Sequence, residues 1–169
     1  MEERTGAITM KGKPLTLMGH EIKVGDQAPD AVLVANDLSE VKLSSFKGKK
    51  VILSVVPSLD TPVCDLQTKK FNQQALLLKD VAVLTISKDL PFTQKRWCGM
   101  AEATATKTLS DYRGNFGETY GVLIKGLSLL TRCVFVINES GKVTYIQLVK
   151  EITNEPDYDE VLKAVQGGK

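Results

Sequence analysis

The stretch VILSVVPSLDTPVCDLQ, residues 51–67, decides the fold because it joins an apolar run, a loop containing two prolines and the start of a helix. Residues 51–56 are nearly continuous in apolar character, which is typical of a strand covered on both faces. A second run of this kind follows at 81–87, and the segment between them, 61–79, is unbroken and rich in helix formers. This order predicts two parallel strands joined by a crossover helix.

The alternation of strands and helices continues outside this unit. Strand pairs are predicted at residues 8–19 (turning at 11–13), in AVLVAND with EVKLSSF (31–37 and 40–46), and at 133–149. Helices are predicted at 91–103, at 114–120, and in the tail DYDEVLKAVQGGK (157–169), where the helix stops at Gly167. Since no repeat, low-complexity tract or linker separates these parts, the whole chain 1–169 is predicted to be one α/β domain.

Length and charge exclude several classes of protein. A chain of 169 residues with 43% hydrophobic content is long enough for one well-buried core and short for two. The formal charge is only +2 and the longest basic run is KGKK, so no nucleic-acid partner is indicated. The N-terminus lacks the apolar segment of a secretory signal, and no apolar stretch approaches the roughly 18 residues that a membrane span needs. A cytoplasmic protein without a membrane partner is therefore expected.

Three cysteines, Cys64, Cys98 and Cys133, are a small and odd set for a protein expected inside the cell, where structural disulfides are uncommon. Reactive or simply buried thiols are the two interpretations. For Cys64 the local pattern favours reactivity, because Thr61 is placed to be the N-cap of the helix, Pro62 its first residue and Cys64 its third. Unpaired backbone N–H groups and the helix dipole favour an anion in this first turn, so a thiolate is stabilised there.

The activating group for Cys64 has to be something other than histidine. The one histidine, His20, lies near the N-terminal strand pair and reads as a surface or turn residue. Arg132 is the cation that stands out, because it interrupts the apolar context LSLLTRCVFVI at the start of a strand. A buried arginine needs a partner, and the sequence leaves two open: a structural ion pair with an acid, or the thiolate of Cys64.

Several motifs resemble one protein family. P-S-L-D-T-P-V-C matches the peroxiredoxin active-site pattern of Pro, three residues, Thr, two residues and Cys, on Pro57, Thr61 and Cys64. The stretches KRWCGMAE, LSDYRGNFGETYGV, LLTRCVFVIN and QLVKEITNEPDYDEVL, with the N-terminal strand pair, resemble one branch of that family, the thiol peroxidases. The resemblance covers essentially the whole chain. It implies a thioredoxin-like fold, with a central mixed sheet flanked by helices and an added N-terminal β-hairpin.

The resemblance also implies a mechanism. Cys64 corresponds to the cysteine that attacks hydrogen peroxide or an organic hydroperoxide and becomes a sulfenic acid. The Thr61 hydroxyl and Arg132 set the peroxide geometry, and Pro57 shields the pocket from water. Cys98 then attacks the Cys64 sulfenic acid to form an intramolecular disulfide, which thioredoxin reduces. A homodimer is typical of the family, and neither a cofactor nor a metal is implied.

Other interpretations remain for the cysteines and for the function. Without its pairing to Cys64, Cys98 beside Trp97 reads as a small buried hydrophobe, and Cys133 at the head of an apolar strand reads as a core residue rather than a redox group. A thioredoxin-like reductase needs a C-x-x-C motif, which is absent. The three cysteines and one distant histidine are a poor zinc set. A redox sensor or holdase stays open, and peroxide turnover is the measurement that separates it from an enzyme.

Overall fold

The computed structural model of the chain describes residues 1–167. Its helices are α1 (Pro62–Leu77), α2 (Pro91–Ala101), α3 (Phe116–Thr119) and α4 (Tyr158–Gly167), with the short 3-10 helix η1 (Leu43–Phe46). Its strands are β1 (Glu3–Met10), β2 (Lys13–Met18), β3 (Val32–Val34), β4 (Glu40–Lys42), β5 (Lys50–Val55), β6 (Val81–Ser87), β7 (Lys107–Ser110), β8 (Leu123–Ile124), β9 (Leu129–Leu130), β10 (Cys133–Ile137) and β11 (Val143–Leu148).

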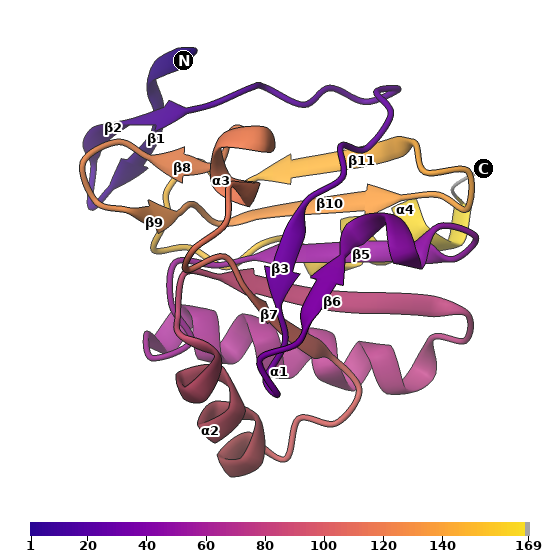
Figure 1. Cartoon of the computed structure of the whole chain (residues 1–169). Helices are drawn as coiled ribbons and strands as arrows, with labels where there is room; N and C mark the ends of the chain where they lie inside the picture. The colour runs from indigo at the N-terminus through magenta and orange to yellow at the C-terminus, as the bar shows by residue number, and fades with distance from the viewer. Residues whose placement is uncertain (168–169) are drawn as a thin grey trace.

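A seven-stranded sheet in the order β11-β10-β5-β6-β7-β3-β4 forms the centre of the molecule (Figure 1). Strands β5, β6 and β7 run parallel, whereas β10, β11, β3 and β4 pair antiparallel with their neighbours. The parallel pair β5 and β6 is joined through α1, as the apolar runs and the helical segment between them predict. The sheet is mixed and helices flank it, so the predicted fold class is confirmed.

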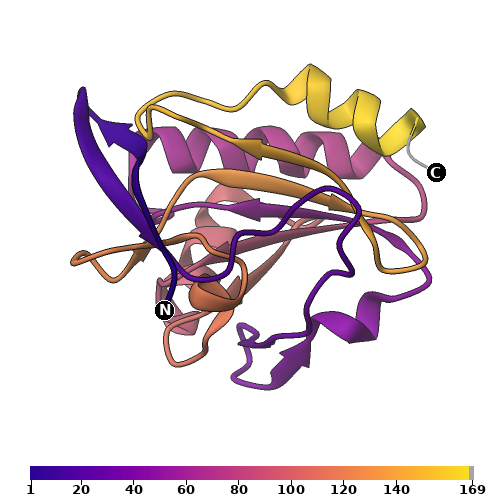
Figure 2. The same ribbon diagram turned by 90° about the horizontal axis from the view of Figure 1, so that it is seen from above.

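Each face of the sheet carries its own apolar core. Figure 2 shows α1 and α4 side by side over one face, where Phe71 and Tyr158 make an edge-to-face ring contact with centroids 5.3 Å apart. Buried strand residues such as Ile52 and Val134 fill the space beneath these helices. Against the other face pack α3, η1 and the long loops, around Tyr120 and Phe135. Burial on both faces explains why the β5 and β6 sequences are almost continuously apolar.

The predicted N-terminal hairpin is confirmed as β1 and β2, but it belongs to a larger unit. Two short strands, β8 and β9, extend it into a four-stranded sheet in the order β1-β2-β8-β9, and neither was predicted. Glu151 fastens the hairpin turn to the rest of the protein by accepting hydrogen bonds from the Gly12 N–H (2.9 Å), the Thr9 hydroxyl (3.0 Å) and Thr153. These donors, the Thr153 hydroxyl foremost, lower the pKa of Glu151 to about 2.

The element boundaries differ from the predictions by a few residues. Helix α1 ends at Leu77 rather than at residue 79, and α3 occupies only the middle of 114–120. Helix α2 stops at Ala101 because Glu102 adopts a left-handed conformation with φ of 53°. Strand β7 was missed altogether. The single domain predicted for 1–169 stays a prediction, and Gly168 and Lys169 lie outside the described residues.

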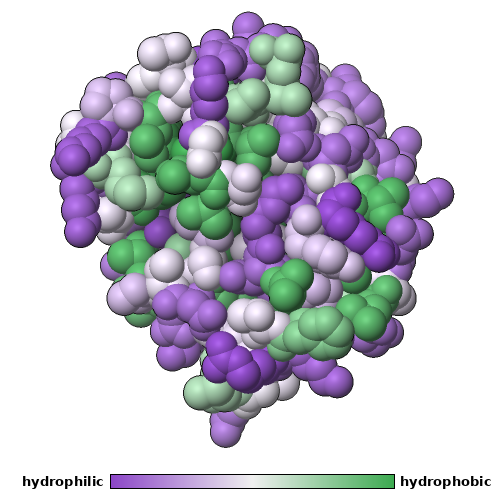
Figure 3. All heavy atoms as spheres, turned by 60° about the vertical axis from the view of Figure 1, so that its left-hand side comes forward, coloured by the Kyte–Doolittle hydropathy of each residue, from purple (hydrophilic) through white to green (hydrophobic). Residues whose placement is uncertain are grey.

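The surface mixes hydrophobic and hydrophilic side chains, as one face shows in Figure 3. Some large apolar side chains are well exposed, including Phe92 and Met100 on α2, at 65% and 74%. Across residues 1–167, no helix is long and apolar enough to cross a membrane.

Candidate active site

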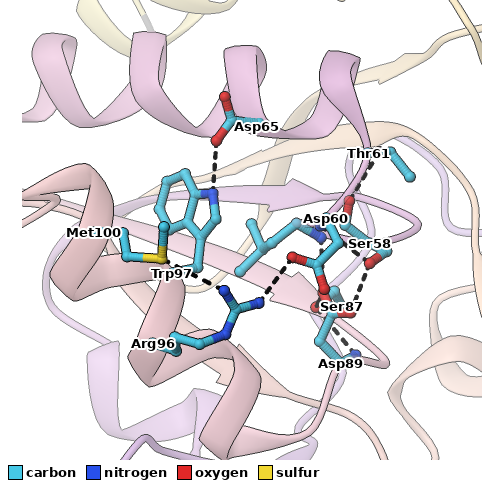
Figure 4. Close-up of polar contacts among 10 residues, drawn as sticks. Ser58, Asp60, Thr61, Asp65, Ser87, Asp89, Arg96, Trp97 and Met100 are labelled. Atoms are coloured by element: carbon cyan, nitrogen blue, oxygen red, sulfur yellow. Dashed lines mark hydrogen bonds and ion pairs between the residues drawn. The ribbon is translucent and has the colours of Figure 1, made fainter.

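The loop before α1 places Cys64 as the sequence predicts. Thr61 has an extended backbone at the N-cap, its carbonyl oxygen accepts the Asp65 N–H at 2.9 Å, and Pro62 is the first helical residue. Cys64 is therefore the third residue of α1. The Thr61 hydroxyl does not cap the helix; it donates instead to the Ser58 carbonyl oxygen at 2.9 Å, within the loop (Figure 4). Its proton is thus engaged by the backbone, while its oxygen keeps acceptor capacity.

Asp89, which the sequence analysis did not identify, holds this loop in place. One carboxylate oxygen accepts from the Ser58 hydroxyl at 2.7 Å, and the other accepts from the Leu59 N–H at 2.8 Å and the Ser87 hydroxyl at 2.7 Å. These charge-assisted bonds join the loop that precedes α1, residues 56–61, to the end of β6. Pro57, at the start of the loop, is buried.

Cys64 itself is fully buried among apolar side chains. Its neighbours in this cluster include Val56, Leu59 and Trp97, and Cys98 packs against the cluster from its partly exposed position on α2. Both thiols are free. The structure thus brings Cys64 and Cys98 to one apolar cluster at the junction of α1 and α2.

Arg132 is buried, with 3% of its surface exposed, and its partners are neutral. Its Nη1 donates to Gln67 Oε1 at 2.8 Å and its Nε donates to the Ile152 carbonyl oxygen at 2.9 Å. Gln67 is held in turn by donating to the Ser54 hydroxyl at 2.8 Å. Among residues 1–167, no carboxylate forms an ion pair with Arg132, which argues against the structural ion pair that the sequence left open.

Gln67 is the second residue that the sequence analysis missed. It lies three positions after Cys64 on α1, so the two side chains project from the same face of the helix. Helical spacing was the available signal, but a glutamine at that spacing is usually solvent-exposed. Here Gln67 is fully buried and orients the guanidinium one helical turn from the Cys64 position.

Two side chains of α2 reach toward the loop that precedes α1 and toward the first turn of α1 itself (Figure 4). The indole N–H of Trp97 donates to Asp65 Oδ1 at 2.7 Å, and Trp97 is buried with 6% exposed. Arg96 pairs with Asp60 at 3.2 Å, with both side chains 57% exposed. Helix α2 is thereby fastened to the segment that carries Cys64.

The Cys98 thiol sits in a closed ring of hydrogen bonds. The Asn36 amide donates to its sulfur at 3.9 Å, the sulfur lies 3.4 Å from the Thr108 hydroxyl, and that hydroxyl donates to Asn36 Oδ1 at 2.9 Å. With the Thr108 proton directed at Asn36, the thiol is the donor to Thr108. A solvent-open groove of about 470 Å³ borders Cys98 and Asn36.

The remaining candidate residues lie outside the apolar cluster that contains Cys64 and Cys98. Cys133 is buried in β10, and burial raises the pKa of its thiol to about 12, which agrees with the interpretation as a core residue. His20 is exposed, and its Nδ1 lies 3.5 Å from Oε1 of Glu2, so it is a surface histidine as the sequence predicts. In the described part of the chain, no group of three or more His, Cys, Asp or Glu side chains could hold a metal ion.

Comparison with known proteins shows the family of the chain. The redoxin family matches residues 23–162. The thiol peroxidase of Halalkalibacterium halodurans is 55% identical over 95% of this chain and 97% of the relative, and that of Bacillus subtilis is 54% identical over 94% and 96%. The solved structure of a peroxiredoxin-like protein from Aquifex aeolicus is 47% identical, with a TM-score of 0.92 and coverage of 97% of this chain and 96% of that chain.

The chain therefore belongs to the redoxin family and, within it, to the thiol peroxidases, which are thiol-dependent enzymes of the peroxiredoxin type. The family resemblance read from the motifs around Pro57, Thr61 and Cys64 is confirmed.

Proposed function

We propose that Cys64 is the nucleophile with which this protein reduces hydrogen peroxide and organic hydroperoxides. The observation that carries the proposal is that a fully buried thiol in the first turn of α1 lies one helical turn from Gln67, which holds the buried Arg132 guanidinium. Within residues 1–167, the hydrogen-bond partners of this guanidinium are neutral. A buried cation without a carboxylate favours an anion nearby, and the Cys64 thiolate is the anion that the fold can supply.

The reaction has a balanced course. The Cys64 thiolate attacks one oxygen of the peroxide, an S–O bond forms and the O–O bond breaks. The electron pair leaves with the second oxygen, which takes a proton and departs as water or an alcohol. Sulfur is oxidised to a sulfenic acid while the peroxide is reduced.

The surrounding residues fit this step. Arg132 stabilises the thiolate and the charge that develops on the oxygens, since a preoriented donor in a dry site acts more strongly than one in water. The Thr61 oxygen is available as an acceptor for the hydrogen of the peroxide, which orients the O–O bond. Pro57 is buried at the start of the loop and keeps water from the sulfur.

Cys98 is the proposed resolving thiol, since it packs on the same apolar cluster as Cys64. Its sulfur attacks the Cys64 sulfenic sulfur, an S–S bond forms and hydroxide leaves to become water. The resulting disulfide within one chain requires an external dithiol for reduction, and we propose thioredoxin as that partner. We also propose a cytoplasmic homodimer, by analogy with the thiol peroxidases.

A coupled assay tests the proposal directly. Thioredoxin, thioredoxin reductase and NADPH are combined with the protein and with hydrogen peroxide or cumene hydroperoxide, and NADPH oxidation is followed. We expect turnover by the wild-type protein and none by Cys64→Ser. Full turnover by Cys64→Ser would exclude Cys64 as the nucleophile, and absence of turnover with any peroxide would favour a redox sensor.

A further inference from the structure

A single strong hydrogen bond joins the two cysteine-bearing helices at the residues beside the cysteines. Asp65 directly follows Cys64 on α1, and Trp97 directly precedes Cys98 on α2. The Trp97 indole donates to Asp65 Oδ1 at 2.7 Å, and Figure 4 shows the indole directed at the first turns of α1. The acceptor is a carboxylate and the donor is buried, so this bond is stronger than a neutral, exposed one.

The other ties across this junction are weaker. The Arg96–Asp60 pair is exposed on both sides and screened by water. Asp65 also pairs with Lys69 at 2.9 Å, but that ion pair lies within α1 and does not reach α2. The Asp65–Trp97 bond is therefore the main polar restraint between α1 and α2.

Cys98 has to leave its present position before it can react with Cys64. Its thiol is bonded to Thr108 and Asn36, and Cys64 is buried in a cluster that Trp97 helps to cover. A disulfide requires the two sulfurs to come within about 2.05 Å with a defined geometry. Movement of Cys98 to that distance moves its neighbour Trp97 as well, and so strains or breaks the bond to Asp65.

We propose that the Asp65–Trp97 hydrogen bond is a latch that sets how long the Cys64 sulfenic acid persists before Cys98 attacks it. The inference rests on the proposed function. While the latch is closed, the sulfenic acid has a second fate: it attacks another peroxide, gains one oxygen as a sulfinic acid and releases water or an alcohol. The latch thus governs the partition of Cys64 between a reversible disulfide and irreversible over-oxidation.

Four variants isolate the bond. Asp65→Ala removes the acceptor, and Trp97→Phe removes the donor while keeping an aromatic cover over Cys64. Asp65→Asn keeps an acceptor oxygen and is the conservative rescue. Lys69→Met is the matched control, because it removes the other partner of Asp65 and leaves the Trp97 contact intact.

Loss of the latch should raise the population of the open arrangement of α2 about tenfold. This factor corresponds to the lower end of the stabilisation that a hydrogen bond to a charged group provides. Disulfide formation should then accelerate about tenfold in Asp65→Ala and in Trp97→Phe. The peroxide concentration that converts half of Cys64 to sulfinic acid should rise by a similar factor. Asp65→Asn should lie between these variants and wild type, and Lys69→Met should match wild type.

The experiment separates the two steps by acid quenching after a graded dose of hydrogen peroxide, with mass spectrometry of the Cys64 peptide. Loss of the Cys64 thiol reports the first step, and the ratio of disulfide to sulfinic acid reports the partition. The double variant Asp65→Ala/Trp97→Phe should behave like either single variant, because both remove one bond. Fully additive effects, or an unchanged ratio in both single variants, would overturn the latch.

The outcome also distinguishes the latch from the function on which it rests. If wild type consumes peroxide at Cys64 but forms no Cys64–Cys98 disulfide, the proposed resolving role fails, and the latch fails with it. If wild type forms the disulfide and the variants do not change the ratio, the latch alone is wrong.

Discussion

Gln67 accepts a hydrogen bond from Arg132 at 2.8 Å, one helical turn along α1 from Cys64. A neutral amide, rather than a carboxylate, therefore orients the buried guanidinium. An acid in this position would neutralise the arginine and compete with a thiolate for it, whereas an amide fixes its direction and leaves its charge uncompensated. This relationship argues against a structural ion pair, which is one of the two partners that the sequence left open for Arg132.

Arg132→Met should slow the first step of the reaction. Removing the buried cation takes away thiolate stabilisation and a donor to the peroxide, so we expect the rate of Cys64 oxidation to fall about 100-fold. Stopped-flow measurement of the first turnover gives this rate. The vacated Gln67 acceptor should also lower the free energy of unfolding by about 1–3 kcal/mol. A variant that reacts at the wild-type rate would reduce Arg132 to a structural role.

The three cysteines should separate by function. Cys98→Ser should consume one peroxide per chain, because Cys64 still reacts, but thioredoxin should not recycle it efficiently. Cys133→Ala should keep nearly full activity, since its thiol is buried in β10 and stays protonated at neutral pH. Peroxide consumed per chain, measured with and without thioredoxin, distinguishes them. Multiple turnovers by Cys98→Ser with thioredoxin would remove Cys98 from the cycle.

Stoichiometric peroxide should link Cys64 to Cys98 within one chain. The oxidised protein should run as a monomer on a non-reducing denaturing gel and give one Cys64–Cys98 peptide pair in a digest. Amide exchange should rise in the first turn of α1 and around Cys98, while β10 should stay protected. Disulfide-linked dimers as the main product would place the resolving thiol on another chain.

Glu151→Gln should weaken the attachment of the N-terminal hairpin in a pH-dependent manner. The pKa of Glu151 is lowered from 4.5 to about 2 in the folded protein, so its stabilisation is present above pH 4.5 and is lost as the pH falls toward 2. The difference in unfolding free energy between wild type and Glu151→Gln should therefore shrink as the pH is lowered from 4.5 toward 2. Urea unfolding at several pH values measures it, with the exposed Glu139→Gln as the control. If the difference in unfolding free energy does not vary with pH, the ionised carboxylate of Glu151 does not hold the hairpin.

Local rules account for what the sequence predicted well. The parallel pair β5 and β6 follows from two apolar runs separated by a helical segment. The third position of Cys64 on α1 follows from Pro62 at the first. These features depend on residues close together in the chain, so one sequence suffices to recognise them.

Long-range pairing explains what was missed. Strand β7 has only four residues and an ordinary polar sequence, and it becomes a central strand because β6 and β3 pair with it on either side. Asp89 and the Asp65–Trp97 bond likewise join segments that are distant in the chain. Their partners are decided by tertiary packing, which leaves no local pattern to read.

The ring around Cys98 also determines what remains when that thiol departs. Thr108 already donates to Asn36, and the adjoining groove is open to solvent, so water would replace the sulfur as the partner of the Asn36 amide. In the proposed cycle, the vacated position would therefore keep the hydrogen bond between Thr108 and Asn36. After reduction of the proposed Cys64–Cys98 disulfide, α2 would return to this site within its own chain, where tethering makes recapture an intramolecular event at high effective concentration. The proposed cycle would thus restore the same starting arrangement of α2 after each turnover.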